Sequence, residues 1–367
     1  MRFSISRESL LAPLQLVSTV VERRQTLPIL ANILLVVDGQ QLSLSGTDLE
    51  VELIGRVTLE GDCEPGEATV SAHKLMDICN NLPTGTQIDI SLDGQKITVK
   101  AGRSRFSLMM LPAHDFPALD EASDGLSVSL LQSDLRHLLE RTQFAMAQQD
   151  VRYYLNGMLL EIRADQVRSV TTDGHRMAMC SLPATVETEE VMQVIVPSKG
   201  VAALLKLLLS AQDTINLVIG KNHIRASTGA FSFASKLVDG KFPEYERVIP
   251  KGGDKQLLIP RQALSEALKR TAILSNEKFR GIRLLLSAGL LKLQANNPEH
   301  EEAEEELSID YSGDALEIGF NEKYVQQALC VMESAQVQLM LSDSNSSALL
   351  QESADSDSIY VIMPMRI

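Results

Sequence analysis

The 367-residue sequence contains no tryptophan, and aromatic residues make up only 4% of it. Proteins that stack single-stranded nucleic acid on aromatic side chains need more aromatic surface, so this class is disfavoured. The cysteines are widely separated, which gives neither a disulfide framework nor the close spacing of a zinc motif, and we expect no metal site: Cys63, Cys79, Cys180 and Cys330. No apolar run approaches the roughly 20 residues that span a bilayer, and the first ten residues lack a signal-peptide core. These absences predict a cytoplasmic protein without membrane contact.

Basic charge is also in short supply. The chain has 34 Lys+Arg against 48 Asp+Glu, a net charge of −14. Taken whole, it does not resemble a histone-type DNA binder. The charge is unevenly distributed, because residues 126–250 are neutral overall while both flanking thirds are acidic. From Leu293 to Glu322 there is no Lys or Arg. This run is either a solvated acidic face or one half of an interface that needs a basic partner surface.

The sequence repeats at an interval of about 125 residues. Leu10 and Thr47 recur as Leu135 and Thr172, and a weaker third copy follows around Asn296. Within each third, two segments have apolar residues at helical spacing, marked by Leu10, Leu75, Leu135, Val201, Leu264 and Val325. The later helix of each third follows a candidate N-cap, namely Ser71, Ser198 or Asn321. The repeating unit is therefore a half-domain of about 63 residues, used six times.

Between the predicted helices, apolar and polar residues alternate. Ile88, Ile90 and Leu92 show this period of two, and Asp38-Gly39 and Asp93-Gly94 are typical of tight hairpin turns. Each half-domain is thus interpreted as one helix with several antiparallel strands. The predicted fold class is α+β, with three homologous domains of two helices packed on antiparallel sheets.

Catalytic motifs are scarce. There is no Walker loop, no Rossmann fingerprint and no nucleophile elbow. His175, within Thr172-Asp173-Gly174-His175-Arg176, is the one histidine in a motif-like setting. Two hypotheses stay open: a hydrolase that uses His175 and Asp173, and a structural scaffold that binds proteins but not DNA. We expect no catalytic residue and no cofactor.

Several longer strings carry a family resemblance. The segments 149–158 (QDVRYYLNGM), 172–176 (TDGHR), 235–243 (SKLVDGKFP), 273–281 (ILSNEKFRG) and 360–366 (YVIMPMR) resemble the bacterial DNA polymerase III beta subunit family, the sliding clamps. The resemblance covers the whole chain. It implies three clamp domains, at residues 1–121, 122–248 and 249–367. It also implies a head-to-tail homodimer that closes into a ring around duplex DNA, with helices lining the hole.

The resemblance further implies a non-catalytic processivity factor and a set of binding residues. The partners would be double-stranded DNA, the polymerase III alpha subunit, the clamp loader, and other polymerases and repair proteins that carry a short linear motif. Loose DNA-backbone contacts are expected from Arg24, Gln149, Arg152, Tyr153, Tyr154 and Lys199. The motif-binding groove is expected to contain Leu155, Thr172, Gly174, His175, Arg176, Met177, Pro243, Arg247, Val248, Asn321, Tyr324, Ser347, Val361, Ile362, Met363, Pro364, Met365 and Arg366. Asn345 stands where an apolar groove residue is expected.

The dimer interface is predicted to join the first and last domains. Its apolar centre would be Phe106, Ile273 and Leu274. Basic residues of the first domain, Lys74, Lys96, Arg103 and Arg105, would face the acidic residues Glu299, Glu301, Glu302, Glu304 and Glu305. The competing interpretation of Ile273 and Leu274 is that they belong to the ordinary core.

Overall fold

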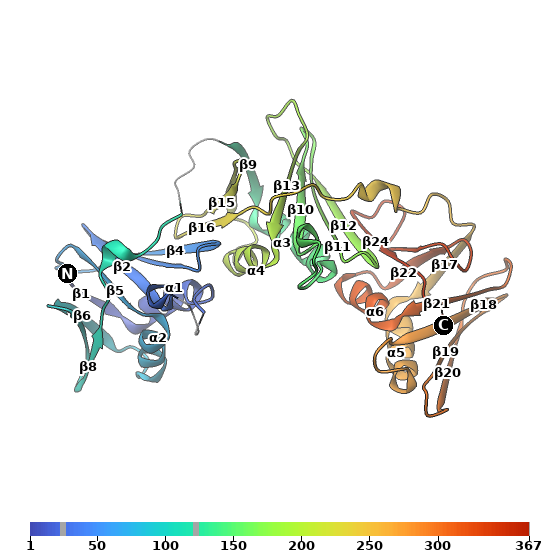
Figure 1. Ribbon diagram of the computed structural model, residues 1–367, viewed down its shortest axis with the longest axis horizontal. Helices are drawn as coiled ribbons and strands as arrows, with labels where there is room; N and C mark the ends of the chain where they lie inside the picture. The colour runs from blue at the N-terminus through green and yellow to red at the C-terminus, as the bar shows by residue number, and fades with distance from the viewer. Residues whose placement is uncertain (23–26, 120–124, 367) are drawn as a thin grey trace. The chain divides into compact units, whose positions relative to one another are not determined.

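The computed structural model describes residues 1–22, 27–119 and 125–366 (Figure 1). Each of the six predicted helices is present, and each contains its apolar marker: α1 (Arg7–Val17), α2 (Ala72–Asn81), α3 (Gln132–Thr142), α4 (Ser198–Leu207), α5 (Arg261–Thr271) and α6 (Glu322–Val331). In the described part of the chain, no helix is long and apolar enough to cross a membrane.

The element order repeats one pattern six times, namely a strand, a helix and three further strands. The half-domain inferred from the helix spacing is therefore confirmed. The first strand of each half-domain, however, does not pair with the three strands that follow its own helix. It joins the last three strands of the other half-domain in the same third, so each third contains two interlocked four-stranded groups.

All strand pairs are antiparallel, and they build two compact units. Unit 1 comprises residues 1–135 and 199–237. Its four-stranded sheet has the order β1 (Arg2–Ser6), β6 (Gln87–Asp93), β7 (Lys96–Ala101), β8 (Ser104–Met109). Its eight-stranded sheet has the order β5 (Gly66–Ser71), β2 (Asn32–Asp38), β3 (Gln41–Thr47), β4 (Val51–Thr58), β16 (Phe231–Lys236), β15 (His223–Ser227), β14 (Thr214–Ile219), β9 (Leu126–Leu131).

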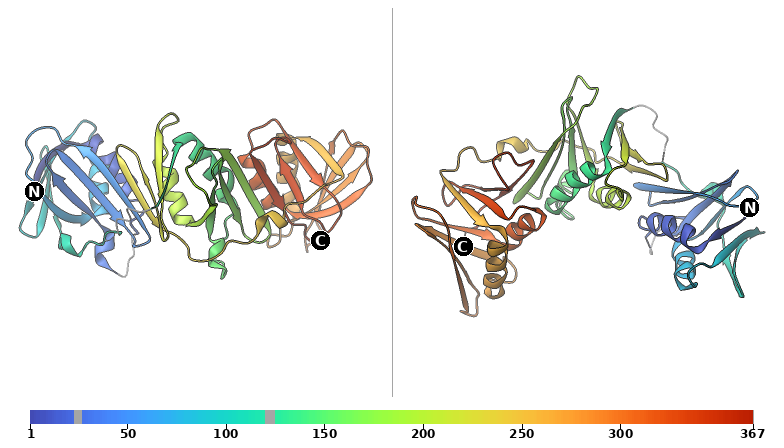
Figure 2. Two further views of the ribbon diagram at one scale, coloured as in Figure 1. Left: turned by 90° about the horizontal axis from the view of Figure 1, so that it is seen from above. Right: turned by 180° about the vertical axis from the view of Figure 1, so that it is seen from behind.

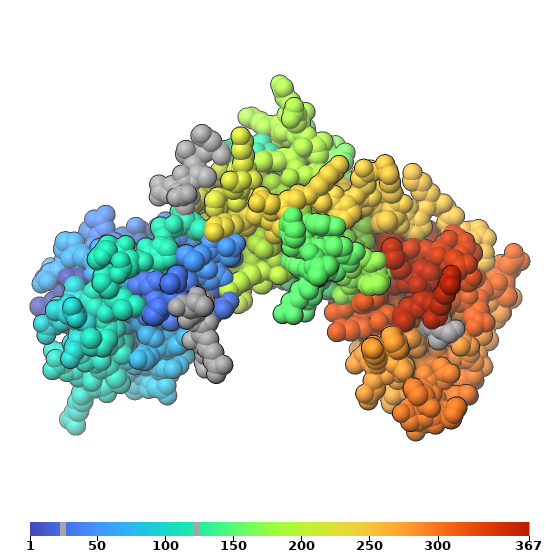
Figure 3. Space-filling model, viewed as in Figure 1, coloured from blue at the N-terminus to red at the C-terminus, as the bar shows by residue number. Residues whose placement is uncertain are grey.

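Unit 2 comprises residues 136–198 and 238–366 of the described chain. Its eight-stranded sheet has the order β13 (Met192–Pro197), β10 (Gly157–Ile162), β11 (Gln166–Thr172), β12 (Arg176–Pro183), β24 (Ser358–Ile362), β23 (Ala348–Gln351), β22 (Gln336–Leu341), β17 (Lys255–Pro260). Its four-stranded sheet has the order β20 (Glu302–Ser308), β19 (Leu290–Asn296), β18 (Gly281–Ser287), β21 (Leu316–Asn321). The C-terminal segment, red in Figure 3, lies at the surface of this unit.

The helices cover the sheets in pairs. α1 and α2 pack side by side in unit 1, as α5 and α6 do in unit 2 (Figures 1 and 2). The apolar markers are buried: Leu10, Leu75 and Leu135 are fully enclosed, and Val201, Leu264 and Val325 are at most 6% exposed. Burying such side chains contributes about 1.5–3 kcal/mol each, which explains why the apolar period predicts the helices.

Local signals have mixed outcomes. Gly39 and Gly94 follow the ends of β2 and β6 with φ of +52° and +60°, as the tight hairpins require. The Asn321 side chain caps α6 by accepting a hydrogen bond from Lys323 N at 3.0 Å. Ser71 occupies the N-cap position of α2 without a side-chain hydrogen bond, and α4 begins at Ser198 itself.

Candidate functional site

The segment that carries His175 is a tight turn between β11 and β12. Thr172 Oγ1 donates to the carbonyl of Arg176 at 2.6 Å and accepts from Gly174 N at 3.1 Å. One carboxylate oxygen of Asp173 accepts from the backbone N–H groups of His175 (2.9 Å) and Arg176 (3.1 Å). Asp173 is thus used to hold the turn, in the manner of an Asx motif.

The same turn occurs between β3 and β4. Thr47 Oγ1 donates to Val51 O at 2.9 Å and accepts from Leu49 N at 3.1 Å. Asp48 accepts from the N–H groups of Glu50 and Val51 at 2.9 and 2.7 Å. The hydrogen-bonded turn is therefore repeated. Gly174, His175 and Arg176 stand in the second copy where Leu49, Glu50 and Val51 follow the aspartate in the first.

Arg176 lies beneath this turn in a largely buried position. Its guanidinium carbon is 4.5 Å from the ring centre of Tyr324 and 5.2 Å from that of Phe144, which are cation–π distances. Its Nε donates to Asp173 at 3.1 Å, and another guanidinium nitrogen donates to the carbonyl of Phe144 at 2.7 Å. Burial lowers the pKa of Arg176, and the Asp173 carboxylate opposes that shift. The cation therefore ties β12 to α6 and is not free to meet solvent ligands.

Arg152 supports the turn from outside. It donates to both carboxylate oxygens of Asp150 at 3.1 and 2.9 Å, and to the carbonyl of Asp173 at 3.2 Å. The hydrogen bonds from Arg152 lower the pKa of Asp150 to about 2. A side chain at Gly174 would meet two guanidinium nitrogens of Arg152 at 3.0 Å, so a residue without Cβ lets this arginine approach.

An apolar hollow of about 180 Å³ opens beside the turn. Nine of the residues predicted for the groove line it: Leu155, Thr172, Gly174, Arg176, Met177, Pro243, Val248, Val361 and Met363. Val248 (41% exposed) and Met363 (38% exposed) leave apolar surface open at its edge. Such a mixture of apolar walls and a few polar groups suits the anchor residues of a peptide.

A second, more polar hollow of about 350 Å³ shares Arg176 with the first. The predicted residues His175 and Tyr324 lie on it, and their rings stack with centroids 6.4 Å apart and an interplanar angle of 16°. Other lining residues have no predicted role of their own: Phe144, Met146, Ala147, Gln148, Lys323 and Gln327. Together, the two hollows form what we call the groove.

The C-terminal segment is held along the groove by backbone hydrogen bonds. Met363 N donates to the carbonyl of His175 at 2.9 Å, and Met365 N donates to that of Gly319 at 2.8 Å. Met365 and Arg366 line a separate hollow with the exposed Phe279. Ile362 is 1% exposed and belongs to the core of unit 2, since it pairs with Arg176 across β12 and β24.

The other predicted groove residues lie outside both hollows. Arg247 is exposed and pairs with Glu244 at 2.6 Å, while Asn321 caps α6 and donates to the carbonyl of Phe279. Ser347 precedes β23, next to Asn345 in the turn organised by Asp343, and Pro364 follows Met363. Tyr154, predicted to contact DNA, lines the apolar hollow, as do Glu244 and Tyr245, for which no role was predicted.

The predicted DNA-contact residues fall in both units. Gln149, Arg152, Tyr153 and Tyr154 come from a short segment of unit 2 in which Tyr153 is 57% exposed and Val151 94% exposed. Lys199 is in unit 1 and forms ion pairs with Glu22 (2.5 Å) and Asp48. Burial alone would lower the pKa of Lys199, but the hydrogen bonds that its ammonium donates to Asp48 and Glu22 outweigh burial and raise the pKa. Arg24 lies outside the described residues.

The predicted interface residues come from α2, β7, β8 and the turn between these strands in unit 1, and from β20, the loop before it and the segment after α5 in unit 2. In unit 1, Lys74, Lys96, Arg103 and Arg105 are exposed, and Phe106 is half-buried on the edge strand β8. In unit 2, Ile273 is 75% exposed directly after α5, so it is not an ordinary core residue. Leu274, beside it, is half-buried.

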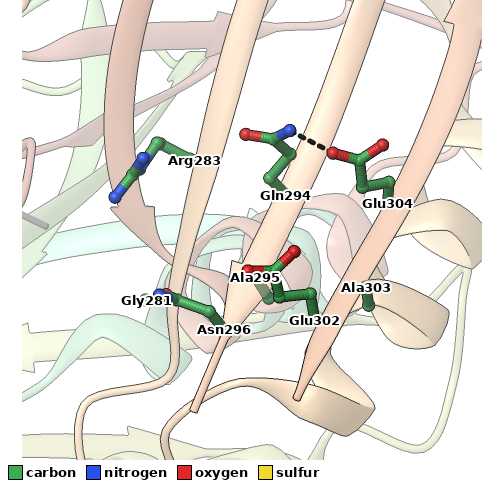
Figure 4. Close-up of a pocket in the computed structure, with 8 residues that line it drawn as sticks. All are labelled: Gly281, Arg283, Gln294, Ala295, Asn296, Glu302, Ala303 and Glu304. Carbon is green, nitrogen blue, oxygen red and sulfur yellow. Dashed lines mark hydrogen bonds between the residues drawn. The ribbon is translucent and has the colours of Figure 1, made fainter. Parts of the chain in front are cut away.

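The acidic run divides between a loop and two faces of the edge strand β20. Glu299 and Glu301 precede the strand, and Glu302 and Glu304 project from one face of it (Figure 4). On that face, Gln294 donates to Glu304, and Lys292 pairs with Glu304 at 2.8 Å. Glu305 lies on the opposite face and accepts from Arg270 of α5 at 2.7 Å.

The chain matches three family models in order. They are described as the N-terminal domain of the DNA polymerase III beta subunit (residues 1–120), its central domain (129–244) and its C-terminal domain (246–366). The beta sliding clamp of Pseudomonas putida is 65% identical over 367 residues and that of Escherichia coli K12 is 50% identical, each covering all of both chains. The crystal structure of the DNA polymerase III subunit beta from Pseudomonas aeruginosa superposes with a TM-score of 0.97 at 62% identity, again over both full chains. The clamp of Caulobacter crescentus superposes with a TM-score of 0.93 at 36% identity over both full chains.

The chain belongs to the DNA polymerase III beta subunit family.

Membership confirms the family resemblance and the α+β fold class of three clamp domains. The clamp function inferred from the sequence is confirmed as well, and the comparisons support neither the hydrolase nor the scaffold hypothesis. Asp173 and His175 have structural partners that agree with this result, because the carboxylate holds the turn and the imidazole stacks on Tyr324. The roles of individual binding residues stay predictions.

Proposed function

We propose that two copies of this chain close head to tail into a ring around duplex DNA and tether a polymerase there, without catalysing a reaction themselves. One observation carries the proposal. Strands from successive thirds of the chain pair at two places, which we call strand junctions, and the two strands that could form a third junction are unpaired sheet edges among the described residues. β4 pairs with β16, and β12 pairs with β24. By position in the repeat, β20 is equivalent to β4 and β12, and β8 is equivalent to β16 and β24.

Both β8 and β20 are sheet edges in the described chain. Unpaired edge strands expose hydrogen-bonding groups and invite pairing with another chain. If β20 of one copy pairs with β8 of the next, the contact is heterologous, and a rotation that closes after two copies gives a ring. We propose the domain boundaries 121/122 and 248/249 for the three segments that the junctions join.

The existing junctions predict the register of the third. Leu53 faces Phe233, and Ala178 faces Tyr360. Leu53 and Ala178 are 125 residues apart, and Phe233 and Tyr360 are 127 residues apart. Continuing both series places Ala303 opposite Phe106. One step along the strands, Glu304 faces Arg105, and a further two steps bring Glu306 opposite Arg103. This register gives the predicted charge complementarity a specific form.

The apolar residues support the same arrangement. Phe233 and Tyr360, on strands that are paired at the two junctions, are each 1% exposed, whereas Phe106, at the open edge, is only half-buried. In unit 2, Phe144 follows α3 and packs on Tyr360 with ring centroids 5.8 Å apart. Ile273 is the corresponding residue after α5, so we infer that it packs on Phe106 of the second copy.

DNA would be held loosely through backbone contacts from Arg24, Gln149, Arg152, Tyr153, Tyr154 and Lys199. Such contacts position a duplex without reading its sequence. A tethered polymerase then meets the primer end at a high effective concentration, which makes it processive. In this arrangement, the acidic remainder of the chain repels DNA from other surfaces.

The groove would bind a short linear motif shared by the polymerase III alpha subunit, the clamp loader, other polymerases and repair proteins. Its support is the apolar hollow with open surface at Val248 and Met363. Methionine adapts its shape to different ligands, which suits a site used by several partners in turn. The cytoplasmic location stays a prediction from the sequence.

The decisive experiment is loading onto nicked circular DNA, followed by linearisation. A ring should remain with the circle through high-salt gel filtration and should slide off once the DNA is cut. Retention on linear DNA with free ends would contradict a topological link, and turnover of a substrate lost on His175→Ala would favour the hydrolase hypothesis instead.

A further inference from the structure

Three potential metal ligands that are far apart in the sequence meet in unit 2. His137 lies on α3, Cys180 on β12, and Asp357 directly before β24. His137 Nε2 is 2.8 Å from a carboxylate oxygen of Asp357, and one ligand atom from each of the three residues lies within 4.8 Å of the others. We propose that His137, Cys180 and Asp357 form a zinc site.

The ligand set and its spacing suit zinc. Imidazole nitrogen, thiolate sulfur and carboxylate oxygen are its usual ligands, and in a tetrahedral site neighbouring ligand atoms are roughly 3.5 Å apart. The separations between the three ligand atoms therefore need to change by at most about 1.3 Å, which rotation of the side chains can supply. Thiolate and imidazole favour zinc over magnesium or calcium. Because His137 (29% exposed side chain) and Asp357 (36%) reach solvent, water can complete the coordination and the ion has a path of entry.

The surroundings hold two of the ligands in place. The backbone N–H of Ser181 donates to the carbonyl of Asp357 at 2.8 Å, and Cys180 pairs with Ser358 across β12 and β24. The hydroxyl of Ser358 donates to the second carboxylate oxygen of Asp357 at 2.7 Å. Hydrogen bonds of this kind orient a ligating carboxylate and contribute to metal affinity.

The charges are balanced once the ion is bound. Zinc replaces the thiol proton of Cys180, and that proton leaves to solvent, so that one thiolate and one carboxylate neutralise the two charges of the ion. Arg141 is the cation near the cluster, and it already pairs with Glu333 at 3.2 Å and Glu352 at 3.3 Å. The bound ion would connect α3, β12 and β24, the same strand junction that supports the groove.

The test uses the full-length chain, stripped of metal by a chelator and titrated with zinc alone by calorimetry. We expect one zinc per chain, and Co²⁺ in its place should give the near-ultraviolet charge-transfer band of a cobalt–thiolate bond. His137→Gln, Cys180→Ser and Asp357→Asn should each weaken zinc binding at least roughly 100-fold. Cys330→Ser (an exposed thiol) and Cys79→Ser (a buried thiol outside the cluster) are the matched controls and should bind as the parent does.

Three outcomes would overturn the proposal: no stoichiometric zinc in the parent chain, an unchanged cobalt–thiolate band in Cys180→Ser, or loss of the band in Cys330→Ser. If Cys180→Ser folds poorly because a buried thiol is replaced, His137→Gln and Asp357→Asn decide the matter, since both side chains are partly exposed. Unchanged zinc affinity in both would leave the cluster as an ordinary histidine–carboxylate pair next to a core thiol.

Discussion

Replacing Ile273 by alanine should weaken the proposed dimer without disturbing the chain's own fold. Ile273 is 75% exposed, and its removal therefore opens no cavity inside the chain. In the proposed ring, its side chain packs on Phe106 of the second copy, as Phe144 packs on Tyr360 within unit 2. The substitution removes three carbons, each worth about 0.8 kcal/mol when buried, or about 2.4 kcal/mol in full.

Ile273 is 75% exposed in the single chain, so only this fraction of its surface can become buried on dimerisation. The free energy of association therefore falls by about 1.8 kcal/mol for each interface. A closed ring contains the interface twice, so dimerisation should weaken by about 3.6 kcal/mol, or roughly 400-fold in the dissociation constant. Replacing Leu274 as well should weaken the dimer further, because Leu274 lies beside Ile273 and is only half-buried in the single chain.

Sedimentation equilibrium over a concentration series measures this change directly. Leu209→Ala is the matched control, because Leu209 is 74% exposed and lies outside the proposed interface. Circular dichroism and the melting temperature of the monomeric species should remain those of a folded chain. Equal dissociation constants for the Ile273 and Leu209 variants would refute the interface, and so would an Ile273 variant that is unfolded.

Three further predictions concern charge, the groove and pH. Arg105→Glu and Glu304→Arg should each weaken the dimer, and about 0.2–1 kcal/mol is the usual range for an exposed ion pair. The double variant should recover most of this loss. If a sedimentation series shows no recovery, the proposed register is wrong. Deleting residues 363–367 should abolish the binding of partner peptides, measured by fluorescence polarisation, while the dimer persists. The reason is that Met363 lines the apolar hollow and its N–H donates to the carbonyl of His175. Normal peptide binding by the truncated chain would show that this segment is not part of the groove. The hydrogen bonds from Arg152 lower the pKa of Asp150 to about 2, so they stabilise the fold at pH values above the ordinary pKa of an aspartate, and this stabilisation is lost as the pH falls toward 2. Arg152→Gln should therefore raise the pKa of Asp150, as measured by carbon NMR. An unchanged pKa would contradict this cause.

The helices could be predicted because burial imposes the same apolar period in all six half-domains. Strand partners could not, because alternation shows that a segment is a strand but not which strand it meets. The pairing of β1 with β6 is an example, because α1, α2 and four strands lie between them in the chain. This exchange interlocks the half-domains and produces the edges at β8 and β20 on which the proposed ring depends.

The structure brings predicted groove residues together where one segment supplies several of them. The turn at Thr172 and the C-terminal segment both contribute to the groove. The sequence could not show the direction of single side chains. Tyr154 lines the apolar hollow, and Ile362, between the groove residues Val361 and Met363, is buried in the core. His137, Cys180 and Asp357 offered no signal at all, because their proximity arises from the pairing of β12 with β24 and the placement of α3.

The repeated turn explains how one of several similar junctions came to carry the groove. The turns at Asp48 and Asp173 have the same hydrogen bonds, and both place the next residue at positive φ, +78° for Leu49 and +88° for Gly174. Since a leucine occupies this position in one copy, the backbone alone does not demand glycine in the other. At Gly174 the guanidinium of Arg152 adds a second reason for glycine beside the positive φ, because it would lie 3.0 Å from a Cβ and would have to shift. The turn itself is thus a shared structural device, and the groove arises from the side chains placed upon it: a glycine that admits Arg152, a histidine that stacks on Tyr324, and an arginine buried between two rings.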